Sequence, residues 1–264
     1  LLLLPVCWAL VLAARGLPSW ELFAIFTAGA FLMRSAGVIL NDLADQSFDR
    51  RVTRTKSRPL ASGELTRAQA FVLLALLLAA AGLLLVFLNP LTRWLAPIAV
   101  ALAALYPFAK RFIHIPQAIL GIAFGWGTIM AWTATRNTVE PQAWIVFAAT
   151  AVWAIAYDTI YAVQDQEDDR RIGVKSSALL FGSALWMAVG LALGTMLVLL
   201  VLAGRLADIG WAYYLALGAV GIFFAVQSAA LRNRVDPPQA FRMFQAHVWA
   251  GAAILAGLVA GFLL

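Results

Sequence analysis

Apolar residues fill long runs of the chain, and short polar segments separate these runs. A helix needs about 20 mostly apolar residues to cross the roughly 30 Å hydrocarbon core of a bilayer. By that measure the pattern predicts nine spans, at about 1–14, 21–40, 68–88, 94–109, 116–134, 141–163, 177–203, 209–231 and 239–263. Turn residues mark breaks in the pattern, at Asn89-Pro90, Pro107, Pro116, Gly204 and Pro237-Pro238. We therefore expect an all-α fold, a multi-pass transmembrane helical bundle that forms one integral-membrane domain over residues 1–264.

Charged residues make up only 12% of the chain, whereas 63% of its residues are hydrophobic and the mean hydropathy is +0.88. Soluble domains carry roughly 25% charged residues, so this composition excludes a soluble enzyme, a disordered chain and a nucleic-acid-binding domain. The single cysteine, Cys7, excludes an intramolecular disulfide, and His114 and His247 are too far apart in sequence to favour a haem or zinc core. No basic segment precedes the first apolar run, so we expect a truncated first span and not a signal peptide.

Basic residues predict the orientation, because Lys and Arg concentrate in the cytoplasmic loops of membrane proteins. Four alternate loops, after the second, fourth, sixth and eighth spans, hold most of them: Arg50, Arg51, Arg54, Lys56, Arg58, Arg67, Lys110, Arg111, Arg170, Arg171, Lys175, Arg232, Arg234 and Arg242. The opposite loops hold only Arg15, Arg93, Arg136 and Arg205, while Arg34 lies inside the second span. The first set of loops is therefore predicted to face the cytoplasm, and the net charge of +6 reflects membrane orientation.

Acidic residues are scarce, and most of them fall in two short stretches at the predicted cytoplasmic ends of spans. The first stretch runs from Asn41 to Asp49 and the second from Asp158 to Asp169. On a helix, the four-residue spacing of Asn41, Asp45 and Asp49 places these side chains on one face. Asp158, Asp165 and Asp169 share a face in the same way, at spacings of seven and four.

Stacked carboxylates repel one another, and near a bilayer the repulsion requires a counter-charge. Mg²⁺ is such a counter-charge, because it prefers oxygen ligands and typically joins one or two carboxylates to a substrate phosphate. Several cations in the same loops are suited to neutralise phosphate oxygens: Arg58, Lys110, Arg111, Arg170, Arg171 and Lys175. The two clusters therefore predict a diphosphate site. The alternative is a pair of solvated, charged loops that only cap helix ends.

The residue sequences of both motifs resemble the signature motifs of the UbiA-type intramembrane prenyltransferases. The first signature is Asn41-Asp42-Leu-Ala-Asp45 with Asp49, followed by Arg-Thr-Lys-Ser-Arg58-Pro-Leu and Gly63. The second runs from Tyr157-Asp158 through Tyr161, Asp165 and Asp168-Asp169 to Ile-Gly-Val-Lys175-Ser. The resemblance covers essentially the whole chain. Three segments favour one branch of this family, the enzymes that prenylate 4-hydroxybenzoate in ubiquinone biosynthesis. These segments are Tyr106 to Arg111, Pro116-Gln117 and residues 172–182.

The resemblance implies an enzyme that uses Mg²⁺ to transfer a polyprenyl group from its diphosphate to the ring carbon ortho to the hydroxyl of 4-hydroxybenzoate. It implies two metal-binding sets, with Asp42 and Asp168 as second choices: Asn41, Asp42, Asp45, Asp49, Asp158, Asp165, Asp168 and Asp169. Substrate contacts are expected from Arg34, Arg58, Tyr106, Lys110, Tyr161 and Lys175.

Individual roles follow from the same resemblance. Arg34 is expected to pair with the benzoate carboxylate or to form a structural ion pair, and Asp45 or Asp158 is expected to take the ring proton. A dry, aromatic-lined pocket is expected to hold the allylic cation, and its candidate lining residues are Tyr106, Phe124, Trp126, Tyr157 and Tyr161. The alternative for each of them is an ordinary aromatic residue of a membrane span or interface.

The expected partners are polyprenyl diphosphate, 4-hydroxybenzoate and the lipid bilayer, with no nucleic acid and no obligate protein partner. The expected location is the bacterial inner membrane, with the acidic motifs on the cytoplasmic side. A sister enzyme with a naphthoate or another acceptor is one alternative. A cation or phosphate-ester transporter is a second, although transporter sites usually lie near mid-membrane on broken helices.

Overall fold

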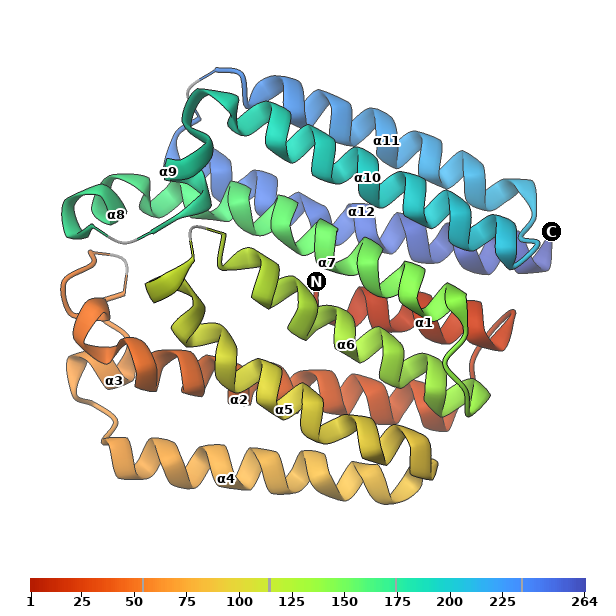
Figure 1. The fold of residues 1–264 in the computed structure, drawn as a ribbon, viewed down its shortest axis with the longest axis horizontal. Coiled ribbons are helices and arrows are strands. Elements are labelled where there is room, and N and C mark those ends of the chain that lie inside the picture. Colours follow the sequence, from red (N-terminus) through yellow and green to blue (C-terminus); the bar gives the residue numbers. More distant parts are fainter. Residues whose placement is uncertain (54, 114, 174, 234) are drawn as a thin grey trace.

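The computed structural model describes residues 1–264 except Arg54, His114, Val174 and Arg234, and it leaves the side chains of Lys110, Arg111 and Ile172 undescribed. All regular structure in this part of the chain is helical, as the sequence predicts. The elements, drawn in Figure 1, are α1 (Leu3–Ala14), α2 (Trp20–Asp49), α3 (Pro59–Ser62), α4 (Arg67–Leu84), η1 (Leu85–Phe87), α5 (Pro90–Phe112), α6 (Gln117–Arg136), α7 (Pro141–Ala162), η2 (Val163–Asp165), α8 (Gln166–Ile172), α9 (Ser177–Phe181), η3 (Gly182–Ala184), α10 (Leu185–Leu206), α11 (Trp211–Ala230) and α12 (Pro237–Leu263).

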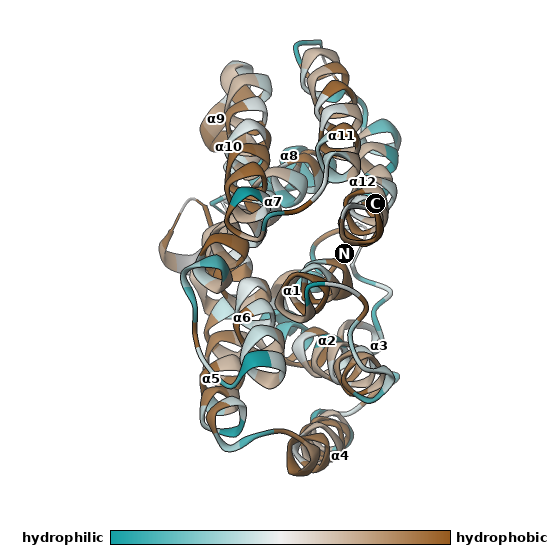
Figure 2. Cartoon of the chain, turned by 90° about the vertical axis from the view of Figure 1, so that its right-hand side faces the viewer, coloured by the Kyte–Doolittle hydropathy of each residue, from teal (hydrophilic) through white to brown (hydrophobic). Residues whose placement is uncertain are grey.

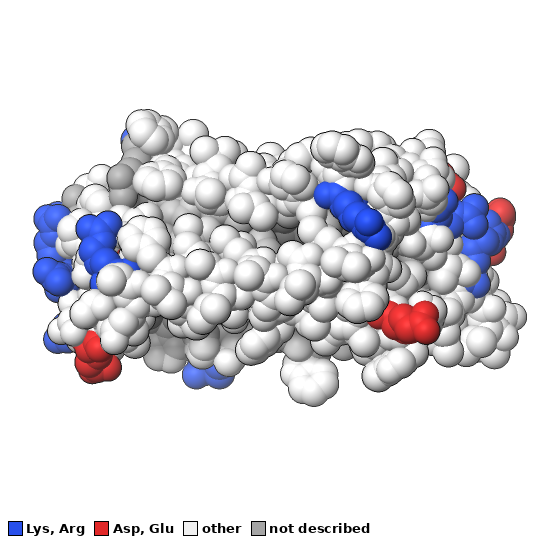
Figure 3. All heavy atoms as spheres, turned by 90° about the horizontal axis from the view of Figure 1, so that it is seen from below, with Lys and Arg blue, Asp and Glu red and all other residues white. Residues whose placement is uncertain are grey.

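Eight helical segments of the described residues are long and apolar enough to cross a membrane. They agree with eight of the nine predicted spans, and the ninth is α1, which has only 12 residues. Large apolar side chains on these helices face outward, for example Leu76 on α4 and Leu191 on α10, which are 63% and 66% exposed. Figure 2 shows α4 and α10 as largely hydrophobic ribbons, and Figure 3 shows a broad uncharged band between charged ends. An exterior of this kind is solvated by lipid, so the chain is an integral membrane protein.

At the starts of α2, α4 and α5, side chains satisfy some of the free backbone N–H groups that every helix start exposes. Ser19 accepts a hydrogen bond from the backbone N–H of Leu22, and Thr66 and Gln69 form a reciprocal capping box. Asn89 caps α5, in which Pro90 occupies the first position because it has no N–H to satisfy. The predicted break at Asn89-Pro90 is thus a helix start.

Two predicted breaks are wrong, because Pro107 and Gly204 lie inside helices. Pro107 belongs to α5, which continues to Phe112, as membrane helices tolerate an internal proline when neighbouring groups satisfy the freed carbonyl. Gly204 belongs to α10, where a Cβ atom would lie 2.9 Å from Cδ1 of Tyr213. This glycine therefore serves the close approach of α10 to α11 and does not end the helix.

The short helix α1 lies in the middle of the bundle, between α6 and α12 (Figure 1). Residues 5–13 are all buried, and a helix that is apolar on every side is expected to be surrounded by other helices. The indole N–H of Trp8 donates a 3.0 Å hydrogen bond to the carbonyl of Gly251 on α12. A Cβ atom at Gly251 would lie 2.7 Å from Leu4 and 2.8 Å from Trp153, so only glycine allows this contact.

The four loops with most of the basic residues lie at one end of the bundle. In Figure 1 this is the left-hand end, where α3, α8 and α9 are also found. Both acidic motifs reach this end, because α2 continues to Asp49 and α7 is extended by η2 and α8. The fold therefore brings together two motifs that are more than a hundred residues apart in the chain.

Candidate active site

The first acidic motif lies on the last turns of α2. The helix extends beyond the predicted apolar span as far as Asp49, so Asn41, Asp45 and Asp49 follow one another at single-turn spacing, as predicted. Asp45 is fully buried, and Asp49 is 7% exposed. Both residues line one large cavity, together with Asn41 and Asp42.

Arg58 joins two carboxylates of this motif. Its Nη1 atom lies 2.8 Å from Oδ1 of Asp42 and 3.0 Å from Oδ2 of Asp49. Gln46 and Arg50 hold the segment around α3 against α2, because they donate hydrogen bonds to backbone carbonyls there at 2.9 and 3.1 Å. Asp42, a second choice from its helical position, is therefore part of the cluster, and Arg58 lies at the carboxylates where a diphosphate is predicted to bind.

The second motif is not one continuous helical face. Asp158 lies on α7, Asp165 ends the 3₁₀ turn η2, and Asp169 lies on α8. All three nevertheless line the same cavity as the first motif. Asp168 does not line it, and its carboxylate lies 3.8 Å from Arg171 on the same helix.

The cavity has a volume of about 2100 Å³. Oxygen-bearing side chains from α2, α7, η2 and α8 line one part of it. Apolar side chains of α1, α2, α4, η1, α5 and α6 line much of the remainder, among them Val6, Ile25, Phe26, Leu77, Leu78, Ala81, Leu85, Val100, Ala103 and Leu120. The cavity thus combines a polar region with a long apolar region.

Aromatic residues from three helices line the cavity near the second motif. The ring of Tyr161 on α7 lies 4.8 Å from that of Phe244 on α12, and Tyr157 lies 5.8 Å from Phe244. Tyr106 on α5 and Phe241 on α12 also line the cavity. A cluster of ring faces beside carboxylates suits a reaction in which positive charge develops on carbon.

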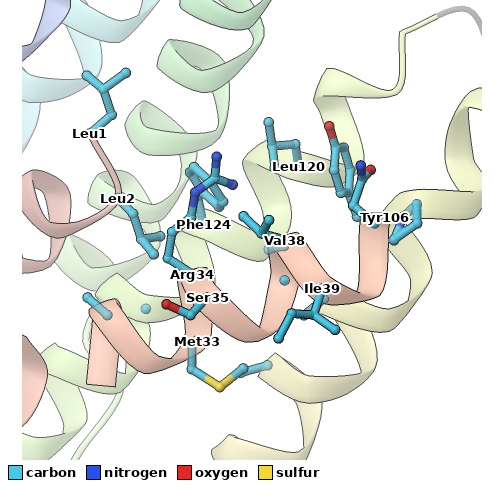
Figure 4. A pocket seen from close by; sticks show the side chains of 18 of the residues that line it. Leu1, Leu2, Met33, Arg34, Ser35, Val38, Ile39, Tyr106, Leu120 and Phe124 are labelled. Atoms are coloured by element: carbon cyan, nitrogen blue, oxygen red, sulfur yellow. The ribbon is translucent and has the colours of Figure 1, made fainter. Parts of the chain in front are cut away.

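Arg34 extends from α2 into the same cavity, as Figure 4 shows. Its guanidinium carbon lies 6.0 Å from the centroid of Phe124 on α6, within the range of a cation–π contact. Among the described residues, no salt bridge of Arg34 with Asp42 or Asp45 is seen. Trp126 does not line the cavity, because its indole donates to the carbonyl of Leu95.

Of the other predicted cations, Lys175 lines the cavity and Lys110 cannot be placed. The ammonium group of Lys175 donates to the carbonyl of Phe112 at 3.1 Å, which connects the loop before α9 to the end of α5. The side chains of Lys110 and Arg111 lie outside the described residues.

The donor set fits Mg²⁺ by its chemistry. Every candidate ligand is a carboxylate or an amide oxygen, which are the ligands that this ion prefers. Among the described residues, no three acidic, histidine or cysteine side chains converge into a ready-made metal centre. Mg²⁺ is usually held by one or two carboxylates and completed by substrate phosphates and water.

The helical bundle and its cavity define a class: multi-pass membrane proteins with a carboxylate-rich site at one end of an apolar chamber. Residues 2–262 match the UbiA prenyltransferase family, and the chain belongs to this family. The resemblance carried by the two acidic motifs is confirmed, and with it the prediction of a prenyltransferase.

Close relatives share the full length of the chain. The 4-hydroxybenzoate octaprenyltransferase of Pseudomonas aeruginosa is 44% identical over 264 residues, which are 100% of this chain and 89% of the relative. The protein of the same name from Cupriavidus necator is 44% identical over 262 residues, which are 99% of this chain and 92% of the relative.

Solved structures share the fold at lower identity. A UbiA homolog from Aeropyrum pernix superposes with a TM-score of 0.84 at 24% identity, over 98% of this chain and 96% of that one. A UbiA homolog from Archaeoglobus fulgidus, solved bound to GPP and Mg2+, gives a TM-score of 0.69 at 15% identity, over 100% of this chain and 96% of that one.

Gln117, Phe241 and Phe244 are among the cavity residues for which the sequence predicts no role. Phe241 and Phe244 stand three apart on α12, and their sequence looks like that of any lipid-facing aromatic pair. Gln117 could have been recognised more easily from the sequence, because an amide at the start of an apolar span needs a hydrogen-bond partner.

Proposed function

We propose that this protein transfers a polyprenyl group from polyprenyl diphosphate to the ring carbon ortho to the hydroxyl of 4-hydroxybenzoate, with Mg²⁺ as cofactor. The observation that carries the proposal is the meeting of oxygen ligands from α2 and α7–α8 at one part of an apolar cavity. The names of relatives that are 44% identical over the whole chain support the choice of acceptor.

The diphosphate would bind between the two motifs. Asn41, Asp45 and Asp49 on one side and Asp158, Asp165 and Asp169 on the other would hold Mg²⁺, with Asp42 as a further oxygen donor. The chemistry that bound Mg²⁺ supplies is neutralisation of the charge that develops on the departing diphosphate.

Cationic side chains would assist at the same place. Arg58 is held beside the first motif by its ion pairs with Asp42 and Asp49. The other N–H groups of its guanidinium are suited to bind phosphate oxygens. Lys175 and Lys110 are proposed to bind the diphosphate as well.

The transfer itself exchanges one bond for another. The bond between the allylic carbon and the diphosphate oxygen breaks, and its electron pair stays with the diphosphate. The allylic carbon then bonds to the ring carbon, which loses a proton. Tyr106, Tyr157 and Tyr161 would face the positive charge and exclude water.

Asp158 is proposed to take the ring proton, and Arg34 is proposed to hold the benzoate carboxylate. Both predicted catalytic carboxylates, Asp45 and Asp158, are also proposed Mg²⁺ ligands, and Asp158 is chosen because it interacts electrostatically with Arg34. Arg34 lies beside Phe124, which offers a ring face for the acceptor to stack on.

The location follows from the charge distribution. We propose the bacterial inner membrane, with both acidic motifs on the cytoplasmic side, because the basic loops lie at the same end of the bundle as these motifs. Cysteine labelling of single-cysteine variants in intact cells tests this sidedness.

Membranes that contain the protein should convert 4-hydroxybenzoate and a short allylic diphosphate to the prenylated acid when Mg²⁺ is present. A chelator should stop the reaction, and added Mg²⁺ should restore it. Competition with a dihydroxynaphthoate decides the acceptor, and preference for the naphthoate would contradict the proposal. Mg²⁺ flux into liposomes without prenylated product would point to a transporter instead.

A further inference from the structure

Gln117 is a buried amide beside the reaction centre that the proposed mechanism leaves without a task. It is the first residue of α6, it is 4% exposed, and it lines the cavity. Its Oε1 atom is buried and has no hydrogen-bond partner among the described residues. A buried acceptor without a donor is unfavourable, so this atom indicates a ligand that supplies one.

The position of Gln117 follows from close packing of α6 against α7. A Cβ atom at Gly121 would lie 2.9 Å from Cα of Ala151, and one at Gly125 would lie 2.9 Å from the ring of Phe147. Only glycine permits such an approach. The two antiparallel helices are thus held together one turn away from Gln117, which brings its amide to Asp158 on α7.

Asp158 determines which way the amide points. The side chain of Gln117 lies within interaction range of the carboxylate of Asp158. A carboxylate only accepts hydrogen bonds, so Gln117 must present its NH₂ group to Asp158. Its Oε1 atom is then directed away from Asp158 and is available to a donor in the cavity.

The opposite end of this cavity wall carries a cation. Phe124 lies two turns, about 10 Å, along α6 from Gln117, and Arg34 lies against Phe124. Leu120 lies between them on the same wall, and Figure 4 shows Leu120 and Phe124 with Arg34 in the close-up of the cavity. The wall thus offers an acceptor at one end, an apolar strip in the middle and a guanidinium at the other.

We propose that Gln117 binds the hydroxyl group of the aromatic acceptor, with its Oε1 atom accepting the O–H hydrogen bond. The inference rests on the proposed function and adds the residue that recognises the hydroxyl end. An aromatic acid with its hydroxyl opposite its carboxylate matches the two ends of the wall. Because Gln117 lies beside Asp158, the ring carbon next to the hydroxyl would lie near the carboxylate proposed to take its proton.

The test compares three acceptors in wild type and in Gln117→Met, a variant of similar size without the amide. The acceptors are 4-hydroxybenzoate, 4-aminobenzoate, which keeps a donor, and 4-methoxybenzoate, which has none. The preference in kcat/KM for 4-hydroxybenzoate over 4-methoxybenzoate should fall roughly 10- to 100-fold in the variant. Intrinsic reactivity of the rings cancels in this comparison of ratios.

Gln227 on α11 provides the matched control. It is 5% exposed, its Oε1 atom also has no partner among the described residues, and it does not line the cavity. Gln227→Met should leave the acceptor preference unchanged. The KM for the prenyl diphosphate should change little in either variant.

An unchanged acceptor preference in Gln117→Met would overturn the inference, as would a change confined to the KM for the diphosphate or to the Mg²⁺ requirement. If Gln117→Met fails to accumulate, the inference is tested by measuring how tightly the acceptors bind to the wild-type protein in the absence of a prenyl donor. There 4-hydroxybenzoate should bind at least about tenfold more tightly than 4-methoxybenzoate, and equal binding refutes the role. Failure of wild type to prenylate any of the three acids would instead refute the proposed function.

Discussion

Replacing Arg58 by alanine should destabilise the protein, because this side chain separates two carboxylates that would otherwise repel each other. One nitrogen atom of Arg58 lies within hydrogen-bonding distance of both Asp42 and Asp49. In Arg58→Ala these carboxylates lose their shared cation while they remain largely buried, at 14% and 10% side-chain exposure.

The loss of stability expected for Arg58→Ala lies between the values known for buried and for exposed ion pairs. Breaking a fully buried pair by removing one partner destabilises by about 3–5 kcal/mol, whereas an exposed pair contributes about 0–1 kcal/mol. Arg58 is 31% exposed, so we expect a loss of about 2–3 kcal/mol. For a chain of this size, that corresponds to a decrease of roughly 4–10 °C in the unfolding midpoint.

The assay is thermal unfolding of detergent-solubilised protein at one fixed scan rate, since membrane proteins of this kind often unfold irreversibly. Arg136→Ala is the control, because Arg136 forms an exposed 3.3 Å pair with Glu140 outside the cavity and should change stability by less than about 1 kcal/mol. Added Mg²⁺ should reduce the deficit of Arg58→Ala, because a cation that binds the folded carboxylates stabilises the fold. Equal unfolding midpoints for Arg58→Ala and Arg136→Ala would refute the reasoning. If added Mg²⁺ does not raise the midpoint of Arg58→Ala, Asp42 and Asp49 do not bind the metal.

Four further variants, with Gly194→Ala as a packing control, test the site and the helix packing around it. Asp45→Asn and Asp165→Asn should each abolish Mg²⁺-dependent transfer, measured as prenylated product, while the protein remains folded in the membrane. Arg34→Ala should raise the KM for the aromatic acid much more than the KM for the prenyl diphosphate in steady-state kinetics. Gly121→Ala should destabilise by about 1–3 kcal/mol in thermal unfolding, because its new methyl group meets the backbone of α7. Gly194→Ala should be neutral or slightly stabilising, since nothing lies within 4 Å of the added carbon.

Asp208→Asn is the control for the carboxylate variants, because Asp208 is 84% exposed and pairs with Arg15 outside the cavity. Retained transfer in Asp45→Asn or Asp165→Asn would remove that residue from the metal site. Equal increases of both KM values in Arg34→Ala would indicate a structural role for this cation.

The sequence predicts the long helices well, because the length of an apolar run and the turn residues beside it are local properties. The same holds for α2, where the spacing of Asn41, Asp45 and Asp49 needs only a regular helix. The second motif follows the prediction less closely. The 3₁₀ turn at Val163–Asp165 interrupts the expected helical face, and no residue in that turn marks it.

Contacts between distant helices lie beyond local patterns. Gly204 resembles a helix terminator until Tyr213 is seen packed against it, and Phe244 resembles a lipid-facing residue until the cavity is seen behind it. The pairing of Arg58 with the α2 carboxylates likewise depends on a loop that folds back on its own helix. Such residues are identified only when the neighbouring helix is known.

The hydrogen bond from Trp8 to Gly251 has a consequence for biosynthesis. It joins residues that are 243 positions apart, so α1 meets one of its main neighbours only after α12 has also been made. Until then α1 lacks the contact with Gly251, and the cavity lacks the wall that α12 supplies. Chains arrested before α12 should therefore be far more sensitive to protease than chains that include it, because the bundle closes around α1 only once α12 is present.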